Sequence, residues 1–405
     1  MEFLNVETLE SAREKLLNCT KNFLSTEMVS TSSALNRILA KDVNTTDNIP
    51  HFRRSTVDGY ALLSSDTAAA GDSIPVFLTL KSRVEIGHSA LISINAGECV
   101  EVPTGGMLPE GADAVVMCEY TEEFGTGIAV STSVAHGENI VSVGEDAMED
   151  TLLLKKGRRI LPQDIGALAA AGLINIPVYT PPKVSIISTG DELTNPNQKP
   201  KLGCVRDINS YALAALATKH GYDVSKTQVL PDDEQMIKNA VVDAIKANDI
   251  VIVSGGSSKG KKDLTRPIFD KITNNGVFTH GIAIKPGKPT ILGQTQCNTL
   301  LVGLPGHPVS AMIMFELLLG WFLNEITQTK PPIPIPARLS CNVATDGKLT
   351  CFPCKIKSCY SGYITEPIFS KSGLITTLVQ ADGYFIVPRD TEGLQEGAEV
   401  FVNLL

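Results

Sequence analysis

The fifteen residues from Asp249 to Asp263, D-I-V-I-V-S-G-G-S-S-K-G-K-K-D, decide how this chain is organised. Ile250 to Val253 form an unbroken β-branched run, which is typical of a strand buried on both faces. A serine-glycine turn and three lysines follow, and a helix is predicted from Leu264 to Asn274. Backbone N–H groups at such a turn favour a phosphate, although a plain strand-to-helix connection has the same pattern.

Composition and charge limit the classes of protein to which the chain can belong. The chain has 405 residues, of which 43% are hydrophobic and 20% charged, so we expect a soluble protein of two to four domains. Its formal charge of −9 argues against a general nucleic-acid or anionic-membrane surface. The N-terminus shows no signal-peptide pattern, and the apolar run Ala311 to Leu323 contains Glu316, which suits a buried helix better than a membrane span.

The nine cysteines form an odd, scattered set, which predicts reduced thiols and a cytoplasmic location. Cys351, Cys354 and Cys359, with Cys341 upstream, have the spacing C-x2-C-x4-C without a matching second pair. A structural metal site is therefore one interpretation, and ordinary strand or loop cysteines are the favoured one.

Changes of pattern divide the chain into four parts. Residues 1–48 together with 140–181 form an expected helical linker region, with helices within 5–40, including Thr31 to Leu39, and over Pro162 to Gly172. Residues 49–139 alternate in short runs and predict a β-rich lobe, and residues 332–405 predict a small C-terminal β domain.

Residues 182–329 alternate between strand and helix, which predicts a mostly parallel sheet covered by helices. Its expected elements are the strands Val184 to Ser188 and Val224 to Val229, the helix Asn209 to His220, and a helix that ends near Asn248. Ligands of such sheets bind at the carboxyl ends of the strands. The loops at such ends carry the acids Asp191, Glu192, Asp232 and Asp233, and the turn Ser254 to Asp263.

Two later loops have further candidates for oxyanion binding. In Lys285-Pro-Gly-Lys288-Pro289, prolines restrict the backbone and so pre-position two ammonium groups. Gly303-Leu-Pro305-Gly306-His307-Pro308 follows a strand over Thr299 to Val302 and opens a helix, which makes a second strand-turn-helix anion site. For His307 we favour a hydrogen-bonded loop histidine over a ligand or proton shuttle.

Seven motifs in order resemble the molybdopterin molybdenumtransferase family of the MoeA type, which includes the C-terminal domain of gephyrin. They span essentially the whole chain: Pro50 to Ala61 with Asp58-Gly59-Tyr60; Pro103-Thr104-Gly105; Gly144-Glu145-Asp146; Ser188 to Leu193; Ser254-Gly255-Gly256 to Asp263; Lys285 to Pro289; and Gly303 to Ser310.

The resemblance implies an elongated four-part subunit in a homodimer, with the cleft shared between subunits. It also implies the reaction: molybdate is inserted into adenylylated molybdopterin, AMP is released, and Mg²⁺ or a similar ion assists. Other proteins of molybdenum cofactor synthesis are implied as partners.

This reaction assigns expected roles to residues. Glu192, Asp232 and Asp263 are the expected metal ligands, with Asp233 as an alternative to Asp232. Asp58, Glu192 and Asp263 are the catalytic candidates, and Asp58 would orient or deprotonate water. Asp58, Thr104, Asp146 and Ser372 match family cleft residues. The substrate-binding candidates are Thr104, Asp146, Ser254, Gly255, Gly256, Lys285, Lys288, Pro305 and Ser372.

The chain departs from the family pattern at three places. Val141-Ser142-Val143 stands where a basic run is usual, His307 stands where asparagine is commoner, and the loop after Gly256 carries Lys259, Lys261 and Lys262. One hypothesis is that these lysines replace the missing positive charge. A tungstate-inserting paralogue, a non-catalytic molybdopterin-binding scaffold and a nucleotide sensor are the alternatives, and the retained acids argue against a scaffold.

Overall fold

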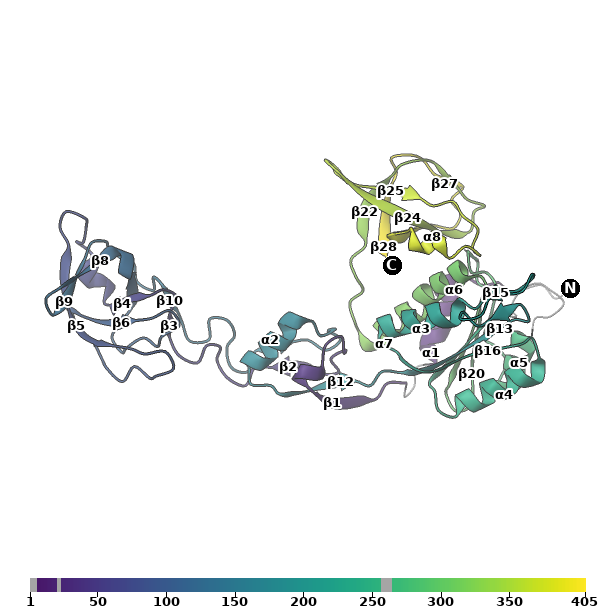
Figure 1. Cartoon of the computed structure of the whole chain (residues 1–405), viewed down its shortest axis with the longest axis horizontal. Helices are drawn as coiled ribbons and strands as arrows, with labels where there is room; N and C mark the ends of the chain where they lie inside the picture. The colour runs from purple at the N-terminus through teal and green to yellow at the C-terminus, as the bar shows by residue number, and fades with distance from the viewer. Residues whose placement is uncertain (1–5, 20–22, 256–263) are drawn as a thin grey trace.

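The computed structural model describes residues 6–19, 23–255 and 264–405. The chain is elongated: a β-rich lobe lies at one end, the α/β region and the C-terminal domain lie at the other, and a small region around α2 lies between them (Figure 1). The predicted multidomain α/β and β architecture is confirmed.

The α/β region is built on a six-stranded sheet of order β16-β13-β17-β21-β20-β18. The strands β16, β13, β17 and β21 are parallel, and β20 runs antiparallel to β21. Their bounds are β13 Lys183–Thr189, β16 Asp223–Leu230, β17 Ile250–Ser254, β18 Thr279–His280, β20 Ile291–Gln294 and β21 Leu300–Leu304. Two short strands, β14 Leu193–Thr194 and β15 Val205–Arg206, pair beside the sheet.

Helices cover both faces of this sheet because each central strand is apolar on both sides. One face packs against α1 Leu9–Asn18, α3 Asn209–His220, α6 Pro308–Phe315 and α7 Trp321–Thr327. The other face packs against α4 Glu234–Ile245 and α5 Thr265–Ile272. The helix α1 therefore belongs to the core of the α/β region, although the sequence analysis groups residues 1–48 with 140–181.

The run from Pro308 to Thr327 is one continuous helical segment, in which the π turn η4 Glu316–Gly320 joins α6 to α7. Length and composition alone would let it cross a membrane, but 67% of its apolar window is buried within the structure. The prediction of a buried helix around Glu316 is thus confirmed.

The lobe is a six-stranded sheet of order β7-β4-β6-β5-β9-β8. Its strands are β4 Gly59–Leu62, β5 Val76–Arg83, β6 Glu98–Val102, β7 Ala114–Met117, β8 Thr121–Phe124 and β9 Gly127–Val130, with 3-10 turns η2 Ser64–Thr67 and η3 Cys118–Tyr120. At its base β3 Arg54–Ser55 pairs with β10 Ile140–Val141. The predicted β-rich lobe is confirmed.

The middle region contains more strand than the sequence suggests. The helix α2 Pro162–Ala170 forms as predicted, with proline in its first turn. The helix predicted over Thr31 to Leu39 is wrong: only the 3-10 turn η1 Thr31–Ser33 forms there. It follows β1 Thr26–Ser30, which pairs with β12 Asn175–Tyr179, and β2 Val43–Asn44 pairs with β11 Leu152–Leu154.

The C-terminal domain is a small β barrel, as predicted in outline. Pairing runs β24-β25-β22-β28-β26, and an additional β24–β26 pairing closes the ring. The bounds are β22 Ile335–Leu339, β23 Val343–Ala344, β24 Leu349–Cys359, β25 Gly362–Pro367, α8 Thr376–Val379, β26 Gly383–Val387, β27 Gly393–Leu394 and β28 Glu399–Leu404. One strand from the α/β region, β19 Ile284–Lys285, pairs with β24 and so joins the two regions.

Candidate functional site

The first part of the site is the pair of turns at the carboxyl ends of β17 and β21. Ser254 and Pro305 are buried there, and Ser254 Oγ donates to the Pro305 carbonyl oxygen at 3.3 Å. Asn209, at the start of α3, is also buried, and its Nδ2 donates to Ser254 Oγ and to the Gly306 carbonyl oxygen, each at 2.8 Å. One amide group therefore fixes both turns.

Gly255 fits this edge because it has no side chain. Its φ is +114°, and a Cβ there would lie 2.3 Å from the Thr189 carbonyl oxygen at the end of β13. Its own carbonyl oxygen accepts from Thr265 Oγ1 at 3.2 Å. Only glycine tolerates both the backbone angle and this approach, so the conformation of the turn requires glycine at position 255.

The acids lie on neighbouring loops of the same edge. Glu192 follows β13 with an exposed side chain that lies over Gly190, where a Cβ would meet its carboxylate at 2.8 Å. Asp232 follows β16, and its backbone N–H donates to Asp191 Oδ1 at 3.0 Å, which ties the two loops together. Asp233 caps α4 by accepting from Met236 N at 2.8 Å. Asp233 therefore serves as the N-cap of α4.

The lysine loop reaches this edge because of strand direction. Since β20 is antiparallel to β21, with Ile291 opposite Gly303, the residues before Ile291 lie level with the carboxyl end of β21. Lys285 is exposed and pairs in register with Thr350 of β24, while Lys288 is half-buried. The Lys288 carbonyl oxygen accepts from Ile282 N and Thr290 N, each at 2.9 Å, which holds the loop in shape.

The C-terminal barrel touches the same edge through Ser372. Its Oγ lies 2.8 Å from His307 Nδ1, next to the Gly306 turn. The favoured interpretation of His307 as a hydrogen-bonded loop histidine is therefore confirmed. Gly256, Asp263 and the lysines Lys259, Lys261 and Lys262 lie outside the described residues.

The remaining candidates lie in and below the lobe. Asp58 is exposed, and its Oδ1 accepts from Thr104 N at 2.7 Å. Hydrogen bonds from the Thr104 backbone and side chain lower the pKa of Asp58, because they stabilise its charged form. Asp146 is exposed near the base of the lobe, where its backbone N–H donates to the Ile49 carbonyl oxygen at 3.0 Å. The lobe lies at the other end of the molecule from the α/β edge (Figure 1).

Sequence reasoning missed Asn209 as a residue of the site. In the sequence Asn209 marks only the start of a helix, and the sole signal for a further role is a polar residue at a helix N-terminus after a turn. It also missed Thr189, whose Oγ1 is buried with no hydrogen-bond partner among residues 6–19, 23–255 and 264–405.

The whole length of the chain is similar to one protein family. Three family models match in order: the MoeA N-terminal region, domains I and II, over residues 7–172; a probable molybdopterin binding domain over 185–325; and the MoeA C-terminal region, domain IV, over 336–405. The chain belongs to the MoeA family.

Relatives and structures agree with this membership. The chain is 32% identical to the molybdopterin molybdenumtransferase of Bacillus subtilis, covering 94% of this chain and 90% of that protein. It is 34% identical to that of Haemophilus influenzae, covering 80% and 78%. The crystal structure of the molybdopterin biosynthesis MoeA protein from Pyrococcus horikoshii matches with a TM-score of 0.86 and 32% identity, covering 99% of this chain and all of that one.

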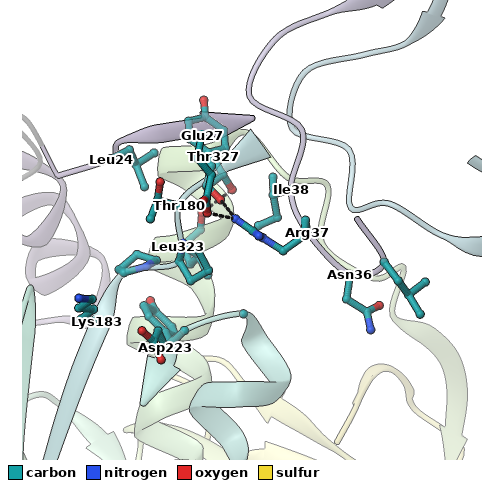
Figure 2. Close-up of a pocket in the computed structure, with 16 residues that line it drawn as sticks. Leu24, Glu27, Asn36, Arg37, Ile38, Thr180, Lys183, Asp223, Leu323 and Thr327 are labelled. Atoms are coloured by element: carbon teal, nitrogen blue, oxygen red, sulfur yellow. Dashed lines mark hydrogen bonds and ion pairs between the residues drawn. The ribbon is translucent and has the colours of Figure 1, made fainter. Parts of the chain in front are cut away.

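A pocket elsewhere in this MoeA-family chain is not the candidate site. It has a volume of about 490 Å³ and lies where the middle region meets the α/β region, between Ile38 and Tyr179 on one side and Tyr222 and Leu323 on the other. Figure 2 shows Arg37 directed at Glu27 there, and its Nη2 lies 2.5 Å from Glu27 Oε1. Among the predicted site residues that the structure describes, none lines this pocket.

Three of the four cysteines that have a metal-like spacing lie on one strand. Cys351, Cys354 and Cys359 all lie along β24, and Cys351 packs in the α/β core whereas Cys354 packs in the barrel core. Burial raises the pKa of Cys351 to about 12 and that of Cys354 to about 11, which disfavours the thiolates that a metal needs.

Proposed function

We propose that this chain is a molybdopterin molybdenumtransferase that inserts molybdate into adenylylated molybdopterin, releases AMP and yields molybdenum cofactor. The observation that supports this most is the shared sheet edge, to which five segments contribute acids, glycine turns and lysines. Family membership supplies the reaction class, because relatives over most of the chain are named for this activity.

At this edge, lysine side chains would supply positive charge and the turns would supply backbone N–H groups. Lys285 and Lys288 would neutralise phosphate and the incoming oxyanion, and the turn amides near Ser254 and Gly255 would hold phosphate oxygens. Thr189 Oγ1, buried beside Gly255, is a further group that needs a partner, as expected of a group that faces a ligand.

The donor set fits a divalent ion such as Mg²⁺. Glu192 and Asp232 come from loops joined by a hydrogen bond, and magnesium is bound by one or two carboxylates together with substrate phosphates and water. Asp263 would be a third ligand. When bound, the ion would neutralise charge on the phosphates during cleavage of the phosphoanhydride.

We further propose a homodimer in the cytoplasm, in which the lobe of one copy completes the site of the other. Asp58, Thr104 and Asp146 adjoin the strands β4, β6 and β10. These strands belong to the lobe, which lies at the far end of an elongated chain (Figure 1). A second copy would bring them to the α/β edge, where the ionised Asp58 would orient water.

The test is incubation of purified protein with adenylylated molybdopterin, molybdate and Mg²⁺, with AMP followed by chromatography. We expect AMP release that needs both molybdate and Mg²⁺ and that falls at least 100-fold, on the order of a lost charged catalytic group, in Glu192→Gln. Release by Glu192→Gln at the wild-type rate would contradict the proposed role of this edge. Replacement of molybdate by tungstate in the same assay distinguishes the tungstate-inserting alternative.

A further inference from the structure

The C-terminal barrel reaches the phosphate-binding turns through the loop around Ser372. Three contacts join this loop to the start of α6. His307 Nδ1 lies 2.8 Å from Ser372 Oγ, Val309 N donates to the Ser372 carbonyl oxygen at 3.1 Å, and a Cβ on Gly373 would lie 3.9 Å from His307 Cδ2.

Through these contacts the C-terminal barrel caps the N-terminus of α6, a role that a residue of the same helix usually has. His307 occupies the N-cap position of α6 with extended backbone angles, yet its side chain makes no hydrogen bond to its own helix. The next residue, Pro308, has no N–H, so Val309 carries the first backbone donor of the helix. That donor is satisfied by Ser372 of the barrel, while the His307 ring crosses in the opposite direction to the Ser372 hydroxyl.

The contacts between His307 and Ser372 lie one residue from the proposed phosphate turns. Gly306 precedes His307, its carbonyl oxygen accepts from Asn209, and a Cβ on Gly306 would lie 3.6 Å from Gly255 Cα. A shift of the barrel loop would therefore displace residues in both turns.

We propose that His307 and Ser372 form a latch that holds the barrel against the phosphate turns, and that His307 is through it a positioning residue for adenylylated molybdopterin. This rests on the proposed function for its substrate. The latch requires histidine at position 307, because the side chain there must reach Ser372 and not its own helix. Asparagine is a strong N-cap residue that would accept from the N–H groups of its own helix and compete with the Ser372 carbonyl for Val309.

A second contact between the two domains should allow variants of His307 to fold. The strands β19 and β24 pair independently of the latch, with Ile284 opposite Leu349 and Lys285 opposite Thr350. Loss of the latch is thus expected to loosen one loop of the barrel without detaching the domain.

The kinetic test compares His307→Ala with wild type, with His88→Ala, an exposed histidine in the lobe, as the matched control. Loss of one hydrogen bond should raise KM for adenylylated molybdopterin about three- to tenfold and leave kcat within about twofold. His88→Ala should leave both constants at their wild-type values. An unchanged KM in His307→Ala would overturn the latch.

Hydrogen exchange followed by mass spectrometry tests the latch without turnover. Peptides covering residues 370–375 should exchange faster in His307→Ala and His307→Asn than in wild type, while His307→Asn keeps or raises the melting temperature because it caps α6 itself. Unchanged exchange in both variants would overturn the latch. If wild type released no AMP, the proposed function would fail, and the exchange result would decide the latch alone.

Discussion

Single residues at the sheet edge show how far side-chain chemistry follows from the sequence. The serine-glycine turn, Glu192 and the two loop lysines were all identified from residue type and position, because strand ends and glycines carry local signals. The role of Asn209 could not be identified in this way, since it depends on two partners that lie 45 and 97 residues away. Whether the residues act as assigned stays a prediction.

Gly255→Ala should destabilise the fold strongly. The substitution forces a left-handed backbone angle and places a methyl group against the Thr189 carbonyl, so we expect a loss of about 2–5 kcal/mol in the free energy of unfolding. Urea denaturation measures this. Gly137→Ala is the matched control, with φ +80° and open space around it, and should lose only about 1 kcal/mol. Equal losses in the two variants would show that the contact with Thr189 has no effect.

Thr104→Val should raise the pKa of Asp58. Hydrogen bonds to the ionised carboxylate lower its pKa, so removal of the hydroxyl moves it upward, while the bond from Thr104 N keeps it below the ordinary value. Asp58 would then lose its charge at a higher pH, and the acidic limb of AMP release would move up with it. Carbon-13 NMR titration of the Asp58 carboxyl measures the shift, and Thr104→Ser, which keeps the hydroxyl, should behave as wild type. A pKa of Asp58 that is the same in all three proteins would rule this out.

Elements with strong local signals were predicted well. The helix Asn209–His220 has the predicted bounds because Gly221, at φ +100°, ends it in the left-handed conformation. The helix expected over Thr31 to Leu39 failed because the preceding segment pairs with Asn175–Tyr179, and long-range pairing overrides local helix preference. The same limit applies to α1, whose place in the α/β core is set by distant side chains.

The π turn between α6 and α7 depends on partners from outside the helix. Tyr222 Oη donates to the Leu319 carbonyl oxygen at 2.7 Å, and Arg13 donates to the Leu317 carbonyl oxygen from two nitrogens, at 2.9 and 2.8 Å. Burial raises the pKa of Tyr222, so the hydroxyl remains a donor throughout the usual pH range. These contacts satisfy carbonyl groups at an irregular part of a buried helix.

Tyr222→Phe should remove the hydrogen bond to the buried Leu319 carbonyl oxygen and reduce the free energy of unfolding by about 0.5–1.5 kcal/mol. Urea denaturation is again the measurement. Tyr211→Phe in the preceding helix α3 provides the control, since Tyr211 is 61% exposed and the change in its free energy of unfolding should stay within about 0.5 kcal/mol. If the two variants were equally stable, the hydroxyl would have no part in holding the π turn.

At the scale of the whole molecule, residue patterns predicted which kinds of domain are present, and the family resemblance implied the elongated shape that is observed (Figure 1). The lobe, the α/β sheet and the C-terminal β domain follow from hydrophobic period. The closure of that domain into a barrel and its contact with α6 depend on side chains and strands far apart in the sequence. We propose that acids from the α/β edge of one copy and Asp58 from the lobe of another act on one substrate.

Mixed dimers test that claim most directly. Asp58→Asn and Glu192→Gln, carrying different affinity tags, are co-expressed, and dimers with one copy of each are isolated through both tags. Each variant alone should be inactive. The mixed dimer would contain one site with both changes and one intact site, so AMP release should recover to about half of the wild-type rate per dimer. Mixed dimers as inactive as the two parent variants would contradict the claim.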